Sequence, residues 1–297
     1  MAVLVRWSGV MTALSSIAHG GETRGTVTML RREAVVTSAG RLVQVPVISG
    51  NAIRRKLREA GEDLLRGVLR YEGEIGLAAA HTLRDGGSLA KAAGEPLSGA
   101  RLARVRALVP LFSIFGGAAG GAIHDGCLQV GKGVPHYDET VELLPAEDVT
   151  FRLSSFAGTQ LERYTRHPDP DQRRMVDLVP LEVGADGLPL LAVDGGESAD
   201  SGARAGMYLV ETFPAGTRFS MWWKLAWATP LEAAFFADVL ATLEGQTQIG
   251  GRLRSGHGLV RFNLTRAVLA GQDEPFDWRS YLTQRRDEAV DAIRLLT

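Results

Sequence analysis

The order of strand-like and helix-like segments in the sequence predicts an α+β fold. A strand comes before a first helix, further strands follow an insertion, and a last strand follows a second helix. The order strand, helix, strands, then helix and strand is that of a split βαβ, ferredoxin-like core. The composition agrees, because 45% hydrophobic and 23% charged residues are typical of a globular chain that can bury a sizeable core.

The first half of the chain is predicted to begin with strands and to continue with helices. Alternating apolar residues indicate a strand over 3–14, a loop over 15–25 and strand-like stretches at 26–36 and 41–47. Ser49 is expected to cap a helix whose apolar side is formed by Ile53, Leu57, Leu64 and Leu65. The Ala- and Leu-rich stretch 62–109, broken by glycine turns, predicts a helical insertion.

In the second half, a charged segment over 151–180 and a Gly-, Asp- and Ser-rich continuation over 184–206 indicate an exposed arm or long hairpin. Segments 207–210 and 218–225 predict a β-hairpin around a Pro-Ala-Gly-Thr turn. The next helix carries Thr229 as N-cap, Pro230 at its first position, Glu232 in a capping box and Gly245 as terminator. A strand over 259–264 and a helix near 277–296 complete the chain.

Charge and cysteine content restrict the class of protein. The net charge is −1, so a polyanion site must be a local patch rather than the whole surface. Only four of the 33 basic residues are lysines, and arginine makes the better bidentate contact with phosphate. A single cysteine, no cleavable leader and no apolar run of about 18 residues favour a cytoplasmic protein without a membrane span.

Two junctions between strands and helices have the chemistry to hold a polyanion. At the first, Ser49, Gly50 and Asn51 precede a helix whose first turns carry Arg54, Arg55 and Arg58. A helix N-terminus presents unpaired N–H groups and a partial positive charge, and glycine lets a phosphate approach the backbone. The alternative interpretation is an ordinary capped helix with a solvated basic face.

The second junction is a loop in which glycine alternates with cationic or hydrogen-bonding residues. Its candidate RNA-binding residues are Gly250, Gly251, Arg252, Arg254, Ser255, Gly256 and His257. Such a loop can surround a phosphodiester with N–H groups while its arginines neutralise the charge. A glycine-rich loop alone also occurs in ordinary turns, so the prediction depends on both junctions together.

Four segments resemble motifs of the RAMP superfamily of CRISPR proteins, and they occur in the family's order. They are 45–54 (VPVISGNAIR), 111–116 (LFSIFG), 211–219 (ETFPAGTRF) and the glycine-rich loop 250–258 (GGRLRSGHG). The first departs from the family pattern, because Val47 and Ile48 stand where glycine and serine are usual. The length of the chain and the residues of these segments are most similar to the backbone subunit of CRISPR effector complexes, in its type IV version.

The resemblance implies an RRM-like palm (1–60, 110–150 and 205–297), a helical insertion (61–109) and a thumb or exposed arm (151–204). It further implies that copies stack along a guide RNA, each holding its sugar-phosphate backbone independently of sequence, beside other CRISPR effector subunits and the nucleic-acid target, in antiviral or anti-plasmid defence. No cofactor, metal or catalytic residue is predicted.

Two other functions remain open from the sequence. One is an RNA-cleaving enzyme of the same superfamily that uses His19, Glu22 or His257 as general acid or base. In type III relatives an aspartate in the loop after the first strand cleaves target RNA, whereas here Glu22 is the loop's one acidic residue. The other is a purely structural assembly protein that binds no RNA.

Overall fold

The computed structural model describes residues 2–87, 96–145, 153–165, 207–245 and 248–296. Its centre is an antiparallel sheet in the order β13 (Val260–Ala270), β1 (Val3–Ala13), β12 (Arg218–Ala228) and β8 (Leu128–Val130). The short strand β9 (Val134–Pro135) also pairs with β12.

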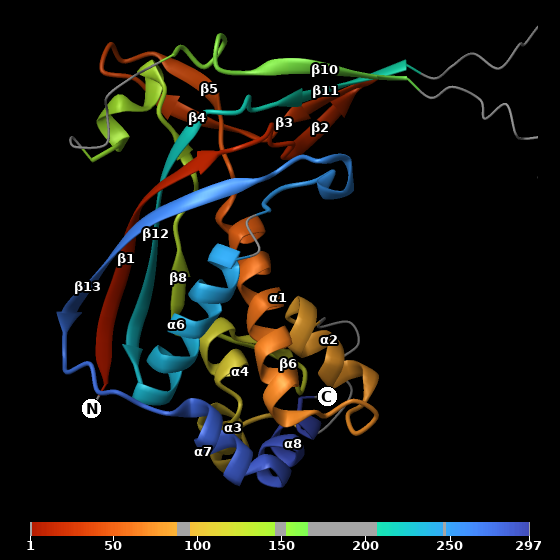
Figure 1. Ribbon diagram of the computed structural model, residues 1–297, viewed down its shortest axis with the longest axis vertical. Helices are drawn as coiled ribbons and strands as arrows, with labels where there is room; N and C mark the ends of the chain where they lie inside the picture. Colours follow the sequence, from red (N-terminus) through yellow and green to blue (C-terminus); the bar gives the residue numbers. More distant parts are fainter. Residues whose placement is uncertain (1, 88–95, 146–152, 166–206, 246–247, 297) are drawn as a thin grey trace, which may run out of the picture.

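Two long helices cover one face of this central sheet (Figure 1). The first is α1 (Gly50–Leu69), which comes after β1 in the chain, with the strands of residues 20–46 between them. The second is α6 (Pro230–Gly245), which follows β12 directly. Trp7 of β1 packs edge-on against Phe236 of α6, with ring centroids 5.2 Å apart. The main hydrophobic core therefore lies between the sheet and these two helices, as burial of apolar area requires.

The caps of both helices are those that the sequence predicts. The Ser49 hydroxyl accepts a hydrogen bond from Ala52 N at 3.3 Å, and Ile53, Leu57 and Leu65 are buried. At α6, Thr229 N donates to the Glu232 carboxylate at 2.6 Å, while Glu232 N donates to the Thr229 hydroxyl at 3.3 Å. This reciprocal pair is a capping box, which satisfies N–H groups that a helix start leaves unpaired.

A second sheet has the order β10 (Gln160–Thr165), β11 (Met207–Thr212), β3 (Val27–Leu30) and β2 (Gly20–Arg24). Beside it, β4 (Arg32–Val36) pairs with β5 (Leu42–Pro46). The prediction of a loop over 15–25 is therefore wrong for residues 20–24. They form a strand because β3 offers them an edge to pair with, a long-range contact that local sequence does not encode.

The predicted hairpin of 207–210 with 218–225 is also wrong, although its turn is present, with Thr217 N donating to Pro214 O at 3.2 Å. The two strands belong to different sheets. One edge of β12 is paired with β1 and the other with β8 and β9, so β11 pairs instead with β10 and β3.

Shorter helices gather at the end of the molecule away from the second sheet (Figure 1). They are α2 (Leu77–Asp85), α3 (Gly99–Leu108), α4 (Pro110–Phe115), α7 (Trp278–Gln284) and α8 (Arg286–Arg294), with the small hairpin of β6 (Gly117–Ala119) and β7 (Ala122–His124). Helices within 62–109 are thus confirmed, whereas the single helix predicted near 277–296 is divided at Arg285.

The α+β class is confirmed. The division into palm, insertion and arm stays a prediction, and most of the predicted arm, 166–204, lies outside the described residues. Among the helices of the described part, none is both long and apolar enough to cross a membrane.

Candidate nucleic-acid interface

The start of α1 is built as a donor-rich surface. Gly50 lies so close to the chain after β8 that a Cβ there would be 2.9 Å from Val130 O. Asn51 is exposed, and the first turn contains no acidic residue. Since the free N–H groups of a helix start carry a partial positive charge, this turn is suited to an anion.

A short segment after β1 joins this helix start to the glycine-rich loop. Gly251 N donates to Ala18 O at 2.7 Å. In the next residue, the His19 ring accepts a hydrogen bond at Nε2 from Ser49 N at 3.1 Å. The two junctions, about 200 residues apart in the sequence, therefore flank the same two residues, and the structure brings them together as the sequence predicts.

The glycine-rich loop needs its glycines for backbone shape. Gly250 has φ +95°, and a Cβ there would lie 2.5 Å from Ala18 O. Gly256 and Gly258 also have positive φ, a conformation open to glycine at little steric cost. Arg254 and Ser255, on a single turn of 3-10 helix (Leu253–Ser255), and Gly256 directly after it are exposed. This part of the loop presents backbone and one arginine to solvent.

Arg252 does not point freely into solvent. Its guanidinium carbon lies 4.8 Å from the ring centre of Tyr164 and 4.9 Å from that of Tyr208, and Nη1 donates to the Tyr208 hydroxyl at 3.1 Å. The two tyrosines face each other across β10 and β11, with stacked rings 5.3 Å apart. Arg252 therefore ties the loop to the second sheet by cation–π contact.

His257 is wrongly assigned to the predicted RNA contacts, because only 3% of it is exposed. Its Nδ1 lies 3.0 Å from the Ser16 hydroxyl, and its Nε2 is bonded to the Tyr164 hydroxyl. The Glu162 carboxylate is 3.5 Å from the same ring. The loop glycines turn this side chain inward, where it fastens the loop to β10 and to the segment after β1.

Arg58 and Arg54 are also corrections, since the predicted role needs guanidinium groups that are free to meet phosphate. Arg58 is 6% exposed, and burial lowers its pKa to about 10. Burial likewise lowers the pKa of Arg54. Both groups instead donate to carbonyl oxygens. The Arg58 guanidinium donates to the carbonyl oxygens of Thr82, Leu83, Phe115 and Gly116, and the Arg54 guanidinium donates to those of Phe115 and Leu128.

Arg55 remains available on the outer side of α1. Its side chain is 69% exposed and pairs with Glu59 at 2.9 Å, an exposed i,i+4 pair that contributes little stability. With Asn51, Arg84 and Asp85 it lines a hollow of about 350 Å³. Arg84, from α2, also pairs with Glu62 at 2.5 Å. This hollow continues the helix start as a cationic depression.

Two surface arginines were missed by sequence reasoning. Arg84 reaches the hollow only because α2 packs on α1, which the sequence does not show. Arg31 is exposed, and its backbone N donates to His19 O at 2.9 Å, beside the segment that joins the two junctions. A count of arginines near Gly21 could have drawn attention to Arg31, but nothing local marks Arg84.

The residues weighed for RNA cleavage lie in three different settings. Burial first, and then the charge of Arg31, lowers the pKa of His19, whose Nε2 accepts from Ser49 N. Glu22 pairs with Arg24 at 2.5 Å on an exposed strand, and His257 is buried. Among the described residues, no group of three His, Cys, Asp or Glu side chains could hold a metal.

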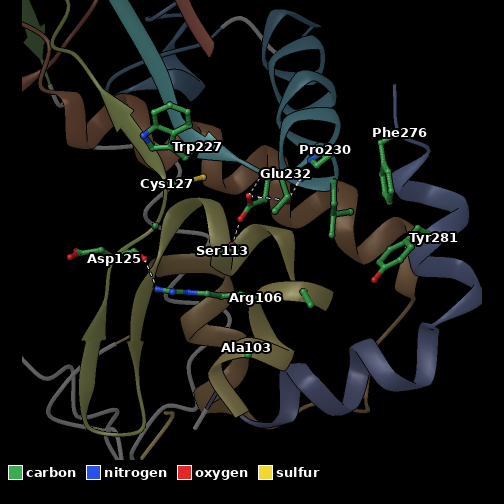
Figure 2. A pocket seen from close by; sticks show the side chains of 14 residues that line it. Ala103, Arg106, Ser113, Asp125, Cys127, Trp227, Pro230, Glu232, Phe276 and Tyr281 are labelled. Atoms are coloured by element: carbon green, nitrogen blue, oxygen red, sulfur yellow. Dashed lines mark hydrogen bonds between the residues drawn. The ribbon is translucent and has the colours of Figure 1, made fainter. Parts of the chain in front are cut away.

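A separate pocket of about 730 Å³ lies at the end of β12, between α3, α4, α6 and α7 (Figure 2). Its polar groups have structural roles. Glu232 caps α6 and accepts from the Ser113 hydroxyl, and the Arg106 guanidinium donates to Asp125 O at 3.3 Å. Burial raises the pKa of the Cys127 thiol to about 12, so this thiol stays protonated at neutral pH.

Comparison with known proteins finds similarity among solved structures. No protein-family model matches the sequence, and neither does any curated protein. Among solved structures, a chain of a structure entitled "Type IV-B CRISPR Complex" superposes with a TM-score of 0.60 at 29% sequence identity. The match covers 94% of this chain and 98% of the other, so it extends over almost the whole of both.

Proposed function

We propose that this protein is a subunit of a type IV CRISPR effector complex, and that it binds guide RNA through the sugar-phosphate backbone. The similarity to a chain of a type IV-B CRISPR complex over almost its whole length supports the first part. In this proposal copies stack side by side along the RNA and contact other effector subunits in the cytoplasm. The chain itself carries out no chemistry.

The topology supports an RRM-like palm of the RAMP type. The central sheet has the order β13, β1, β12, β8, with α1 following β1 and α6 following β12. This is the order in which a βαββαβ chain forms a sheet whose first and third strands are central. The helices packed on one face, together with the inserted helices α2 and α3, agree with a palm that carries an insertion.

The single observation that carries the RNA-binding proposal is the contact of both junctions with Ala18 and His19. It sets the start of α1 and the glycine-rich loop on either side of the same two residues, close enough to contact one RNA strand together. Arg31, Arg55, Arg84 and Arg254 supply positive charge along it. Contacts of this kind recognise phosphate and sugar without reading bases, as a subunit that holds variable guide sequences requires.

The proposal is tested first by the nucleic-acid content of the purified particle, measured as the ratio of absorbance at the nucleic-acid and protein maxima. The double variant Arg55→Ala, Arg254→Ala should copurify with less RNA. Its affinity for unrelated RNAs should also depend less on salt, by roughly 0.7 in log–log slope for each lost phosphate contact. Arg294→Ala is the matched control, because Arg294 is a half-exposed, ion-paired arginine on α8.

An unchanged slope in the double variant would remove these arginines from the phosphate contacts. Cleavage of labelled RNA that is lost in His19→Ala would favour the nuclease alternative. Oligomers that persist after nuclease treatment, with no RNA in the particle, would favour a purely structural assembly protein.

A further inference from the structure

The central sheet has an unusual charge distribution. The strands β1, β8, β12 and β13 contain five basic residues and no acidic residue. The chain as a whole has a net charge of −1, so this sheet differs from the average of the molecule. Because the helices cover one face, most polar side chains of the strands lie on the other. The exception among the basic residues is Arg266, which pairs with Trp7 and lies over its ring on the helix side.

Register places these side chains in rows on the face opposite α1 and α6. Along β1, Val5 and Trp7 are buried toward the helices, whereas Arg6 between them is exposed. Successive side chains of a strand alternate between faces, and directly paired residues share one. Arg6 pairs with Lys224 of β12. Ser8 pairs with Trp222 on one side and with Thr265 of β13 on the other.

A groove of about 990 Å³ runs over these rows. Arg6, Ser8, Trp222 and Thr265 form part of its floor, and Lys132 lies at its side, paired with Glu33 at 2.5 Å. The groove therefore has a hydroxyl-lined floor, an aromatic ring and an arginine, with Lys224 in the adjoining row.

The indole of Trp222 is positioned rather than loosely exposed. It is 36% exposed, and Arg6 lies over it with the guanidinium carbon 5.7 Å from the ring centre. Its Nε1 packs so closely on Gly131 that a Cβ there would be 2.5 Å away. A fixed aromatic ring beside cations is the arrangement that stacks an unpaired base while phosphates are neutralised.

We propose that this open face of the central sheet is a second binding site for single-stranded nucleic acid. It differs from the surface at Ser49 and Gly251 in the residues that would bind, because Arg6, Trp222 and Lys224 belong to neither junction, although Gly50 packs against Val130 at the edge of the groove. Arg6 and Lys224 would neutralise phosphates, and Trp222 would stack one base. Only the identity of the ligand as a strand other than the guide rests on the proposed function; the site itself rests on the groove.

The test is binding of a fluorescein-labelled 15-nucleotide oligo(dT) or oligo(U) to the full-length particle, followed by fluorescence anisotropy. Trp222→Ala should weaken binding about tenfold, the loss of one stacked base. Arg6→Gln with Lys224→Gln should lower the log–log salt slope by roughly 1.4. Trp227→Ala is the matched control, since Trp227 is 62% exposed on the same strand but lines the separate pocket of Figure 2.

Equal affinity in the parent, Trp222→Ala and the Arg6, Lys224 variant would overturn this inference, as would the absence of oligonucleotide binding. Displacement of the oligonucleotide by poly-glutamate at equal charge, with no loss in Trp222→Ala, would instead indicate an acidic protein partner. The two proposals fail separately. Loss of copurified RNA is measured on the Arg55, Arg254 variant, whereas Trp222→Ala should retain its RNA.

Discussion

The arginines of α1 and those of the glycine-rich loop carry the same charge but stand in opposite settings. Along α1, three arginines within five residues divide between the interior and the surface, since Arg54 and Arg58 bond carbonyl oxygens and Arg55 is exposed. In the loop, Arg252 stacks on tyrosines and Arg254 is exposed. In each region one arginine is left for a ligand, and its neighbours hold the surface in shape.

The largest effect expected is the loss of stability in Arg58→Gln. The change removes donors from four backbone carbonyls, and a shorter side chain cannot reach all of them. We expect a free energy of unfolding lower by about 3 kcal/mol, measured by urea denaturation. Arg55→Gln is the control and should change stability by less than about 0.5 kcal/mol. Equal effects would contradict the division of α1 into inner and outer arginines.

A smaller effect is expected at Gly250. An alanine there would need positive φ and would place its Cβ 2.5 Å from Ala18 O, where the two junctions meet. We expect Gly250→Ala to cost about 2 kcal/mol and to lower RNA affinity. Gly256→Ala also needs positive φ, but nothing lies within 4 Å of its Cβ. A cost near 1 kcal/mol with RNA binding retained is therefore expected there, from unfolding and anisotropy titrations.

The contact between the junctions should also make stability depend on pH through His19. Burial, then the charge of Arg31, lowers its pKa in the folded protein below the ordinary histidine value of about 6.5. As the pH falls, the unfolded chain therefore binds a proton at this residue before the folded protein does. The contribution of His19 to the free energy of unfolding is complete above about pH 6.5 and decreases as the pH falls below it. The slope is at most about 1.4 kcal/mol per pH unit. In His19→Gln, whose amide oxygen can still accept from Ser49 N, urea midpoints between pH 5 and 8 should vary less.

Signals within one segment predicted the local structure well. The caps at Ser49 and Thr229, the apolar side of α1 and the α+β class follow from the spacing of residue types within a single helix or strand. The predictions that failed concern pairing. Residues 20–24 and the strand before Pro214 each found partners from distant parts of the chain, and sequence spacing does not contain that information.

The candidate site divides in the same way. Glycine and a helix start can be recognised in the sequence alone, and the structure brings the two junctions together. Whether an arginine side chain is buried or exposed depends on which other segments pack against its helix. Arg58 is buried because Thr82 of α2, within the predicted insertion, and Gly116 after α4 place their carbonyls around it. Arg84 likewise reaches the hollow only because α2 packs on α1.

The smallest effect sharpens the comparison inside the loop. Arg252→Lys keeps the charge but loses the planar group that contacts two tyrosines and the hydrogen bond to Tyr208. An ammonium group retains part of the cation–π attraction, so the loss of stability should be about 0.5 to 1 kcal/mol.

Arg254→Lys is the partner variant, because Arg254 is exposed and a lysine there also meets a phosphate. Its unfolding midpoint should match that of the parent within error, and its salt slope should be unchanged because the number of charges is the same. If Arg252→Lys also left the unfolding midpoint unchanged, Arg252 would not be holding the loop to β10 and β11. Its guanidinium would then belong with the ligand-binding arginines, and the loop would contribute two phosphate contacts in place of one.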